Sequence, residues 1–387
     1  MKTLGSLCDL SVEVLPQVSK VDRDSWNALV EKDHPFLEWD WLSGLEETGC
    51  VSRATGWQPH HLIAWRGDRL EGFCPAYVKS HSRGEFIYDF SWAEAAERAG
   101  IRYYPKLVVG VPFTPANGRR FLMRRGRREH AVRTFGTKLM ELCHGEGFSS
   151  VHVNFCLEEE ARVLSELGYL ERVGYQFHWV NHGWASFEDY LGALRAKRRN
   201  QIRRERRTLK ERGIQIEVLS GPQITAPLMD TMYALYARTV EKHFWSGRYL
   251  SRKFFRLLAE RFAHHLRLSV ALREGRVLAG ALAVAGQRTL YGRYWGAFED
   301  VKFLHFEVCY YRLIEHCLET GLDRFEPGAG GDFKEWRGFA PVPTYSAHYF
   351  RDPRLHRAVG RWLERERAQV EQELSWWATH GSYRRGA

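Results

Sequence analysis

The sequence predicts a mixed α/β protein with two tandem domains, each a largely antiparallel sheet flanked by helices. Its 387 residues exceed the usual domain length of about 100–200 residues. A hydrophobic fraction of 44%, with 14 Trp, 17 Tyr and 22 Phe, can fill two cores. The segments at 67–78 and 275–285 share two glycines at a common offset of 208 residues, which indicates a duplicated domain. We therefore expect domains at residues 1–180 and 181–387.

In the first half, each predicted strand is an apolar stretch bounded by turn residues, and each helix follows a spacing of three to four residues. We expect helices at about 22–31, 38–48, 126–146 and 158–168, and strands at 59–66, 70–78, 86–90, 106–111, 150–155 and 175–181. Gly67 marks a hairpin turn that opens an apolar strand.

In the second half, Ser186 and Asp189 form a capping-box signal that begins a helix at 186–194. The following basic run is expected to continue as a long helix to about 212, where Gly213 stops it. We expect further helices at 226–242, 251–263, 306–321 and 354–378, and strands at 214–219, 266–274, 277–286, 289–298 and 324–328. Gly275 is the counterpart of the hairpin glycine in the first half.

Several classes of protein are disfavoured by the composition. No run of about 18 apolar residues predicts a membrane span, and the start does not resemble a secretion signal. Seven cysteines without a C-x-x-C pair argue against a disulfide scaffold or a zinc ribbon. His264 and His265 are adjacent, so on a helix they would point in different directions. We therefore expect a cytoplasmic protein without a metal, with peripheral contact at the inner membrane as an alternative.

The net charge of +10 is concentrated in the stretch 195–212. This stretch holds ten Lys or Arg residues and two Glu residues, which leaves a net charge of +8. Such a surface attracts phosphate-rich or acidic partners. The candidates are tRNA, an acidic acyl carrier protein and anionic lipid, and the alternative is a solvated helix face.

The stretch GAGGDFKEWRGF, residues 328–339, combines glycines with charges. It is not a Walker A loop, because Lys334 lies three residues after Gly331 and no hydroxyl follows it. It is not a dinucleotide fingerprint, because Phe333 occupies the position of the third glycine. The glycines could still bring backbone N–H groups close to an anion. The alternative is a glycine-rich turn with exposed charges.

Several blocks, including HPFLEWDWLSGLEETGC, VPFTPANGRRFL, QFHWVNHGWASFEDYL and FEPGAGGDFKEWRGF, carry a family resemblance. Over roughly residues 34–367 the chain resembles Fem-like peptidoglycan biosynthesis/recognition proteins of the GNAT (Gcn5-related N-acetyltransferase) superfamily. DFKEWRGF is similar to the F-K-x-G-F-G-like loop of Fem-type enzymes, and Lys334 matches its lysine. The wider family usually has G-A-Q-G-E-H-K-x-x-R-G here, from which this chain departs at Gly330, Asp332 and Phe333.

The resemblance implies two GNAT-like domains and an N-acyltransferase that moves an acyl or aminoacyl group from an activated ester or thioester to an amine. It implies no tightly bound cofactor, and a donor that is aminoacyl-tRNA, acyl-CoA or acylated carrier protein. The acceptor would be a peptidoglycan precursor or a lipid amine. One alternative is lipid-type N-acylation, in which a long-chain thioester acylates a sphingoid-base-like amine. Another is a non-catalytic cell-wall or nucleic-acid binding protein that retains the fold.

Acyl transfer to an amine needs a neutral amine, a stabilised oxyanion and a leaving group that can be protonated. Lys334 is the candidate to stabilise the oxyanion or bind a donor phosphate, and Arg337 could bind a phosphate with two hydrogen bonds. The candidate proton acceptors are Asp332, Glu326, Glu307 and His305. The plain alternatives are that Glu307 complements a helix dipole and that His305 is a packed imidazole.

Substrate-binding candidates occur in both halves of the chain. In the first half, polar residues near one predicted sheet end could hold the acceptor: Lys79, His81, Glu85, Tyr103, Tyr104, Lys106, Thr114 and Arg119. The alternative is that these residues are packing and a solvated hairpin turn. In the second half, four more candidates lie in the matched blocks or the helix beside them: His178, Arg293, Trp295 and Tyr310.

Overall fold

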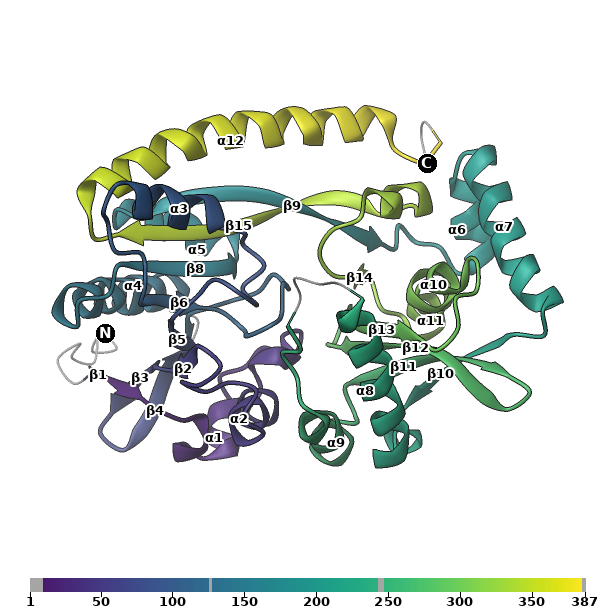
Figure 1. The fold of residues 1–387 in the computed structure, drawn as a ribbon, viewed down its shortest axis with the longest axis horizontal. Coiled ribbons are helices and arrows are strands. Elements are labelled where there is room, and N and C mark those ends of the chain that lie inside the picture. The colour runs from purple at the N-terminus through teal and green to yellow at the C-terminus, as the bar shows by residue number, and fades with distance from the viewer. Residues whose placement is uncertain (1–9, 125–126, 243–246, 385–387) are drawn as a thin grey trace, which may run out of the picture. The chain divides into compact units, whose positions relative to one another are not determined.

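The computed structural model describes residues 10–124, 127–242 and 247–384. The chain divides into two compact units, the first of residues 1–174 and 344–370, the second of residues 175–343 and 371–387. Both units combine strands with helices, so the mixed α/β expectation is confirmed (Figure 1).

The units are not two uninterrupted halves of the chain. The expectation placed the boundary after residue 180 and all later residues in one domain, whereas Thr344–Val370 cluster with the first unit. Three elements therefore pass from one unit to the other: strand β9 (Leu170–Val180), strand β15 (Ala340–Phe350) and helix α12 (Pro353–His380). The first unit thus contains a late segment that a linear division cannot assign to it.

The first unit contains two sets of hydrogen-bonded strands. One set is antiparallel in the order β1-β3-β4-β7 and consists of β1 (Leu10–Leu15), β3 (His61–Arg66), β4 (Arg69–Cys74) and β7 (Leu122–Met123). The other runs in the order β2-β5-β6-β8-β15, with β2 (Trp57–Pro59), β5 (Ala76–Lys79), β6 (Lys106–Val109) and β8 (Ser150–Cys156). Only the β6–β8 pair of this set is parallel.

Five helices accompany these strands in the described part of the first unit. They are α1 (Arg23–Asn27), α2 (Trp39–Glu47), α3 (Phe90–Arg98), α4 (Arg128–Gly145) and α5 (Glu158–Glu166), with 3₁₀ turns at Val18–Lys20 and Pro35–Leu37. Along α4 the buried residues Val132, Phe135, Leu139 and Cys143 recur every three to four positions, so one helix face packs into the core.

The second unit is built on a meander of antiparallel strands. They are β10 (Gln215–Ser220), β11 (Leu266–Arg273), β12 (Arg276–Ala285) and β13 (Thr289–Ala297). Strand β14 (Arg324–Glu326) runs parallel to β13 and antiparallel to the end of β9. Because β14 enters between these two strands, Glu326 lies opposite Tyr291 inside the sheet.

The helices of the second unit carry most of its charged residues. They are α6 (Phe187–Ala193), α7 (Ala196–Glu211), α8 (Ala226–Glu241), α9 (Arg252–Arg261), α10 (Leu304–Phe306), a π-helix (Glu307–Tyr311) and α11 (Arg312–Thr320), with 3₁₀ helices at Gly221–Gln223 and Asp332–Arg337. Ser186 caps α6 by accepting a hydrogen bond of 3.1 Å from the Asp189 backbone N–H, which confirms the predicted cap.

The duplicated hairpins are confirmed, but several other expectations are wrong. Gly67 and Gly275 have φ of 57° and 74° and turn the β3–β4 and β11–β12 hairpins. No strand forms at 86–90, because Phe86 and Tyr88 have positive φ and α3 begins at Phe90. The basic helix is interrupted before Ala196, since α6 ends at Ala193. Strands β1, β7 and β15 and helix α3 were not predicted.

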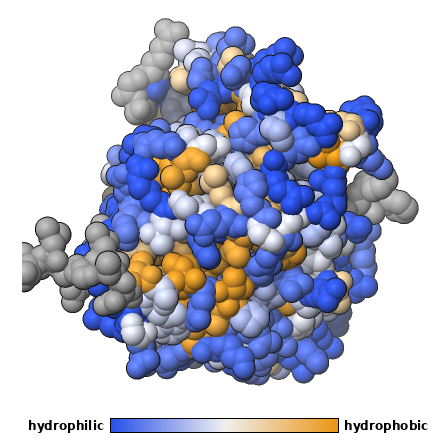
Figure 2. Space-filling model, turned by 90° about the vertical axis from the view of Figure 1, so that its left-hand side faces the viewer, coloured by the Kyte–Doolittle hydropathy of each residue, from blue (hydrophilic) through white to orange (hydrophobic). Residues whose placement is uncertain are grey.

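No helix in the described part of the chain has both the length and the hydrophobicity that a membrane crossing would require. On the face shown in Figure 2, hydrophobic residues gather in patches that hydrophilic residues border.

Candidate functional site

The glycine loop of the second unit is shaped by backbone angles that favour glycine. Gly328, Gly330 and Gly331 have φ of 92°, 73° and 86°, and Gly338 has φ of 76°. The 3₁₀ helix Asp332–Arg337 lies between Gly331 and Gly338. A Cβ at Gly331 would lie 2.7 Å from the Phe333 ring. The glycines therefore allow the tight turns of the backbone before and after the short helix. The side chains of this 3₁₀ helix point in several directions.

Lys334 is a buried cation at the centre of this loop. Its side chain folds back so that Nζ donates hydrogen bonds of 2.6 Å to the Gly328 carbonyl and 3.4 Å to the Ala329 carbonyl. Only 3% of the residue is exposed. Burial lowers the pKa of Lys334 to about 8, and the Cys309 thiol acts in the opposite direction. The lysine is therefore mainly charged at neutral pH but can lose its proton just above it.

The charge of Lys334 reaches two buried histidines. His178 on β9 has a pKa of about 3 and His305 on α10 a pKa of about 4. Burial is the main cause for both. The next cause is the charge of Arg324 for His178 and of Arg337 for His305, and the charge of Lys334 lowers both pKa values further. Both imidazoles are therefore neutral at pH 7.

His178 and Glu326 lie close together on neighbouring strands. The distance from His178 Nδ1 to Glu326 Oε1 is 3.8 Å, and Arg324 Nη1 lies 3.8 Å from the same oxygen. Neither ring nitrogen of His178 has a hydrogen-bond partner among the described residues. A buried imidazole in this state can receive a hydrogen bond from a ligand or a water molecule.

Aromatic rings enclose His305. Its ring centroid lies 4.5 Å from that of Trp295, 5.3 Å from that of Tyr310 and 6.0 Å from that of Phe333. Tyr310 belongs to the π-helix, a helix type that is often found at functional sites. The structure therefore brings together three of the predicted residues, His305, Trp295 and Tyr310, beside the loop that carries Lys334.

Arg337 fixes the loop to helix α7. Its Nη2 lies 3.2 Å from Glu205 Oε2, and Nη1 donates a 2.9 Å hydrogen bond to the Phe333 carbonyl. Tyr311 donates a 2.5 Å hydrogen bond to the same carboxylate. Arg337 is 1% exposed and Glu205 is 2% exposed. These contacts leave the guanidinium no exposed surface for a donor phosphate, so Arg337 positions the loop.

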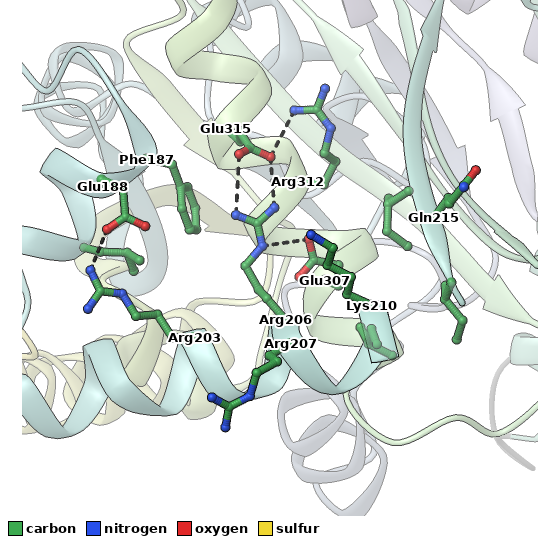
Figure 3. A pocket seen from close by; sticks show the side chains of 14 residues that line it. Phe187, Glu188, Arg203, Arg206, Arg207, Lys210, Gln215, Glu307, Arg312 and Glu315 are labelled. Carbon is green, nitrogen blue, oxygen red and sulfur yellow. Dashed lines mark hydrogen bonds and ion pairs between the residues drawn. The ribbon is translucent and has the colours of Figure 1, made fainter. Parts of the chain in front are cut away.

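Glu307 lies in a different place, a cavity of about 590 Å³ beside α7 and α11. Figure 3 shows Arg206 between two carboxylates, with Nε donating 3.0 Å to Glu307 and Nη2 donating 3.0 Å to Glu315. Burial raises the pKa of Glu307 to about 7, although Arg206 lowers it. A carboxyl group with this pKa can accept or release a proton at neutral pH.

The outer face of α7 is a separate, basic surface. An open hollow of about 650 Å³ is lined by Lys197, Asn200, Gln201, Arg203, Arg204 and Arg207. At one end of the helix, the Arg198 guanidinium lies 4.9 Å from the ring centroid of Trp336. Trp336 is 44% exposed and follows Lys334 by two residues. The basic surface therefore borders the glycine loop through an exposed aromatic ring.

The other predicted residues of this unit are peripheral to these contacts. Asp332 begins the 3₁₀ helix and is exposed. Arg293 lies half-buried on β13, with its guanidinium 5.3 Å from the Tyr294 ring centroid. The predicted residues of this unit are therefore divided between the loop, the Glu307 cavity and the surface.

In the first unit, the structure gathers most predicted substrate-binding residues into a buried polar cluster. Lys106 Nζ donates 2.9 Å hydrogen bonds to Ser82 and Glu85, and a 2.5 Å hydrogen bond to Asp89. Tyr103 donates a 2.6 Å hydrogen bond to Asp89. The Lys106 side chain is fully buried. Its ammonium group therefore bonds to residues of the protein and is not exposed to a ligand.

Lys79 pairs with Lys106 in the β5–β6 register. Its Nζ lies 3.8 Å from the Trp57 ring centroid and 3.9 Å from Glu85 Oε1, and it donates 3.2 Å to the Arg83 carbonyl. Burial lowers the pKa of Lys79 to about 7, which Glu85 opposes. This second lysine is therefore only partly charged at neutral pH.

Of the remaining candidates, Tyr104 and His81 adjoin the cluster and the others do not. The Tyr104 hydroxyl is 2.8 Å from Ser82 Oγ, and His81 Nδ1 is 3.5 Å from Lys79 Nζ. Thr114 donates a hydrogen bond to the Pro112 carbonyl. Arg119 pairs with Glu31 at 2.7 Å and Glu159 at 2.9 Å. Thr114 and Arg119 thus have separate local partners.

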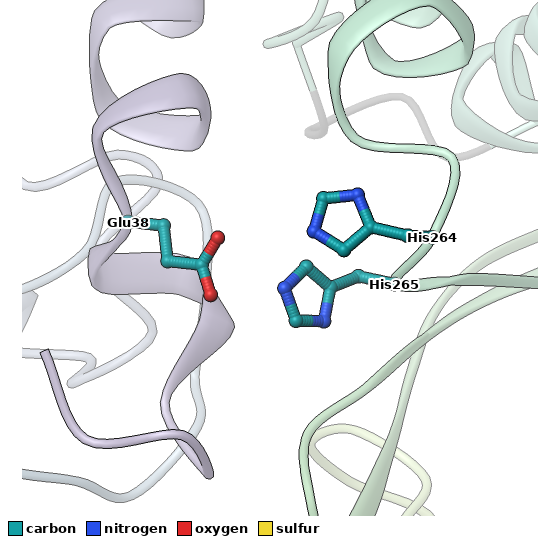
Figure 4. A group of neighbouring side chains, drawn as sticks. All are labelled: Glu38, His264 and His265. Carbon is teal, nitrogen blue, oxygen red and sulfur yellow. The ribbon is translucent and has the colours of Figure 1, made fainter. Parts of the chain in front are cut away.

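His264 and His265 lie outside the helices, as the predicted end of the preceding helix at residue 263 implies. They occupy the turn between α9 and β11, and their ring centroids are 4.2 Å apart. Figure 4 shows the two imidazole rings side by side. Within its own unit the pair offers two ligands, fewer than a protein metal site usually has.

Two buried glutamates of the second unit were not among the predicted site residues. Glu205 falls in the basic run, but its spacing from the buried Ile202 and Leu209 is that of one helix face, and this signal could have identified it. Glu335 follows Lys334 directly and is 5% exposed. No periodic pattern marks Glu335, because a 3₁₀ helix of six residues is too short to show one.

Comparisons with known proteins give one family. The FemAB-like family, described as peptidoglycan biosynthesis/recognition, matches residues 17–385. No curated protein matches the sequence.

Three solved structures illustrate the shared fold. The chain is similar to FemX at 13% identity and a TM-score of 0.53, covering 88% of this chain and 98% of that one. The chain is also similar to the C-terminal domain of a putative lysylphosphatidylglycerol synthetase from Agrobacterium fabrum, at 11% identity and a TM-score of 0.56. This match covers 89% of this chain and 96% of that one. The third is a conserved protein of unknown function from Bacteroides thetaiotaomicron, at 12% identity and a TM-score of 0.52. This match covers 88% of this chain and 100% of that one. Identities this low show a common fold and leave the substrate undefined.

Proposed function

Because the chain belongs to the FemAB-like family of peptidoglycan biosynthesis/recognition proteins, we propose that it is an N-acyltransferase acting on an amine. The family supports a transferase of peptidoglycan biosynthesis. The finer proposal is that an aminoacyl group moves from an RNA-borne ester to an amine, with the centre of the reaction at the loop that carries Lys334.

The observation that carries this proposal is the buried positive charge of Lys334. Its hydrogen bonds go to two carbonyl oxygens, and its charge adds to the larger effects of burial and a neighbouring arginine in lowering the pKa of His178 and His305. A fixed positive potential in a water-poor site stabilises the negative charge that develops on a carbonyl oxygen during acyl transfer. The identity of the residue also agrees with the lysine of the Fem-type loop.

In the proposed reaction, the neutral amine attacks the carbonyl carbon of the ester. A C–N bond forms, the C–O bond to the donor breaks, the amine loses one proton and the leaving oxygen gains one. Lys334 stabilises the oxyanion, and a pKa of about 8 also suits it to protonate the leaving oxygen. Of the candidate bases, His305 lies beside the loop and has a pKa of about 4, whereas Glu307, with a pKa of about 7, lines a different cavity.

An RNA-borne donor is favoured by the surface next to the loop. Helix α7 presents cations along an open hollow, and Trp336 stands exposed between that helix and Lys334. Phosphates bind to such cations, and unpaired bases stack on exposed aromatic rings. An acidic carrier protein would contact the same cations, and acyl-CoA brings phosphates and an adenine base, so the donor screen below separates both from charged tRNA.

The test is a donor screen followed by mass spectrometry of the product. The protein receives charged tRNAs, acyl-CoAs of several lengths or acylated carrier protein, each with peptidoglycan precursors and sphingoid bases as acceptors. Lys334→Ala is expected to reduce the rate by about 10²–10³-fold, as the loss of one oxyanion donor does. The matched control is Lys302→Ala, because Lys302 is an exposed lysine of the same unit.

Each outcome of the screen decides the proposal. Transfer from charged tRNA supports the RNA-borne donor, and transfer from thioesters alone overturns it while leaving N-acyl transfer intact. A Lys334→Ala variant that is as fast as the wild type overturns the role of the loop. RNA binding without turnover of any donor would indicate a binding protein.

A further inference from the structure

A second cavity of the second unit lies at the C-terminal end of the glycine loop, where the loop leads into β15. It has a volume of about 590 Å³, which is within the usual range for small-molecule sites. One wall is the segment from Glu335 to Pro343, and the other is the end of α12 with the residues that follow it, Gly381–Arg384. Both walls belong to the same unit.

The walls of this cavity are mainly apolar. They include Phe339, Pro341 and Pro343 from the loop side and Leu374 and Trp377 from α12. Apolar walls of this kind bind the hydrocarbon part of a ligand, because its transfer from water is favourable. They do not by themselves select a charge.

A buried carboxylate gives the cavity its polarity. Glu335 lines it and is 5% exposed, and Oε1 is buried without a hydrogen-bond partner among the described residues. Glu335 also raises the pKa of Tyr383, a second lining residue, after the larger effect of burial. A buried acceptor without a donor is unfavourable until a ligand supplies one.

The cations of the cavity are arranged differently. Arg195 and Arg384 are exposed. Arg195 donates a 3.1 Å hydrogen bond to the Tyr383 carbonyl, and the Arg384 guanidinium donates to the Gly192 carbonyl. Both groups are thus solvated and already engaged, whereas the Glu335 carboxylate is buried and lacks a donor. Charge recognition inside the cavity therefore favours a cation.

We propose that this cavity binds a primary amine with an apolar body, whose ammonium group donates to Glu335. The aromatic rings of Phe339, Trp377 and Tyr383 line the same space, and aromatic faces attract ammonium groups. The proposal rests on the proposed function in one respect, namely that the acceptor is an amine. It deepens that function by assigning the acceptor an apolar class and a binding residue.

The test is direct binding without any acyl donor. Octylamine, octanol and octanoate share one chain length and differ in their head group, so titration calorimetry at pH 7 separates charge from hydrophobicity. Octylamine is expected to bind most tightly. Glu335→Gln is expected to weaken octylamine binding by about tenfold to a hundredfold, the usual effect of a hydrogen bond to a charged group. It should leave octanol binding unchanged.

The controls keep the result interpretable. Glu217→Gln removes an exposed carboxylate of the same unit and should leave all three affinities unchanged. Glu335→Gln should also melt at a higher temperature than the wild type, because it removes a buried charge without a partner, and octylamine should raise its melting temperature less.

Three results would overturn the proposal. They are octanoate binding as tightly as octylamine, octylamine affinity that survives Glu335→Gln, and no binding of any of the three compounds. Octylamine binding in a protein that transfers no acyl group would uphold the site and refute the proposed function. A productive donor screen in which Glu335→Gln behaves as the wild type would uphold the function and refute the site.

Discussion

Substituting Glu205 by Gln should strongly destabilise the protein. The carboxylate accepts hydrogen bonds from Arg337, Tyr311 and Gln201. The side chains of Glu205 and Arg337 are each 2% exposed. Glutamine has the same shape but no charge, so Arg337 would remain buried without a counter-ion.

The magnitude follows from this burial. Removing one partner of a buried ion pair costs about 3–5 kcal/mol. Glutamine can still accept one hydrogen bond, and Arg337 keeps its bond to Phe333 and its stacking on Phe306 at 3.4 Å. We therefore expect a loss of about 3 kcal/mol in the free energy of unfolding, measured by urea denaturation with circular dichroism and tryptophan fluorescence as independent probes.

A matched control and a double variant make the reasoning refutable. Glu188→Gln breaks the exposed pair with Arg203, whose side chains are 67% and 53% exposed, and should cost less than about 1 kcal/mol. Combining Glu205→Gln with Arg337→Met removes the stranded charge and should recover most of the lost stability. The account of the buried pair is refuted if Glu205→Gln costs no more than Glu188→Gln, or if the double variant is the least stable.

Two further predictions concern titration and binding. Glu307 has a pKa raised from 4.5 to about 7, so its contribution to stability is present below pH 4.5 and is lost as the pH rises through 7. The stability of the wild type minus that of Glu307→Gln should fall by about 3 kcal/mol between pH 4.5 and 8, and a constant difference in urea unfolding would refute the shift. Trp336→Ala should weaken binding of a fluorescent single-stranded oligonucleotide by about 1–3 kcal/mol. Trp376→Ala, which removes another exposed ring, should not weaken it, and equal effects of the two variants would contradict a stacking role for Trp336.

The sequence predicts the repeated hairpins well because their signal is local. A glycine at each turn and an apolar strand after it are sufficient, and Gly67 and Gly275 both have the positive φ that such a turn requires. The prediction of a strand at 86–90 was wrong, and backbone angles again explain the outcome. Its aromatic and branched residues favour a strand, but the positive φ of Phe86 and Tyr88 prevents one. Backbone angles of this kind are set by tertiary contacts.

The candidate site was predictable in part. The glycine loop and its lysine were identified by their spacing and resemblance, and the polar residues near one sheet end do include a cluster around Lys106. Burial was not predictable, because it depends on elements far apart in the sequence. Arg337 is paired with Glu205, 132 residues away, and its charge therefore serves the fold. The π-helix at Glu307–Tyr311 was also missed, since five residues cannot change a helical periodicity.

Lys334 offers a way to separate a functional residue from a structural one. Its pKa is lowered from 10.5 to about 8, so its charged form costs about 3 kcal/mol of stability at neutral pH. Lys334→Met would remove that cost but would leave the Gly328 and Ala329 carbonyls without their donor, at about 1 kcal/mol each. We expect a net gain of about 1 kcal/mol at pH 7, together with the loss of acyl transfer.

The pH dependence of this gain gives the decisive measurement. A lysine with a lowered pKa in the folded state destabilises the protein below pH 8, and the penalty disappears as the pH rises from 8 to 10.5. Between pH 8 and 10.5 the free energy of unfolding of the wild type, measured in urea, should therefore rise relative to that of Lys334→Met. If the variant is less stable than the wild type and the difference does not depend on pH, the main role of Lys334 is to stabilise the loop through its hydrogen bonds to the two carbonyls. A variant that is more stable and inactive would mean that the protein retains a destabilising charge for its chemistry.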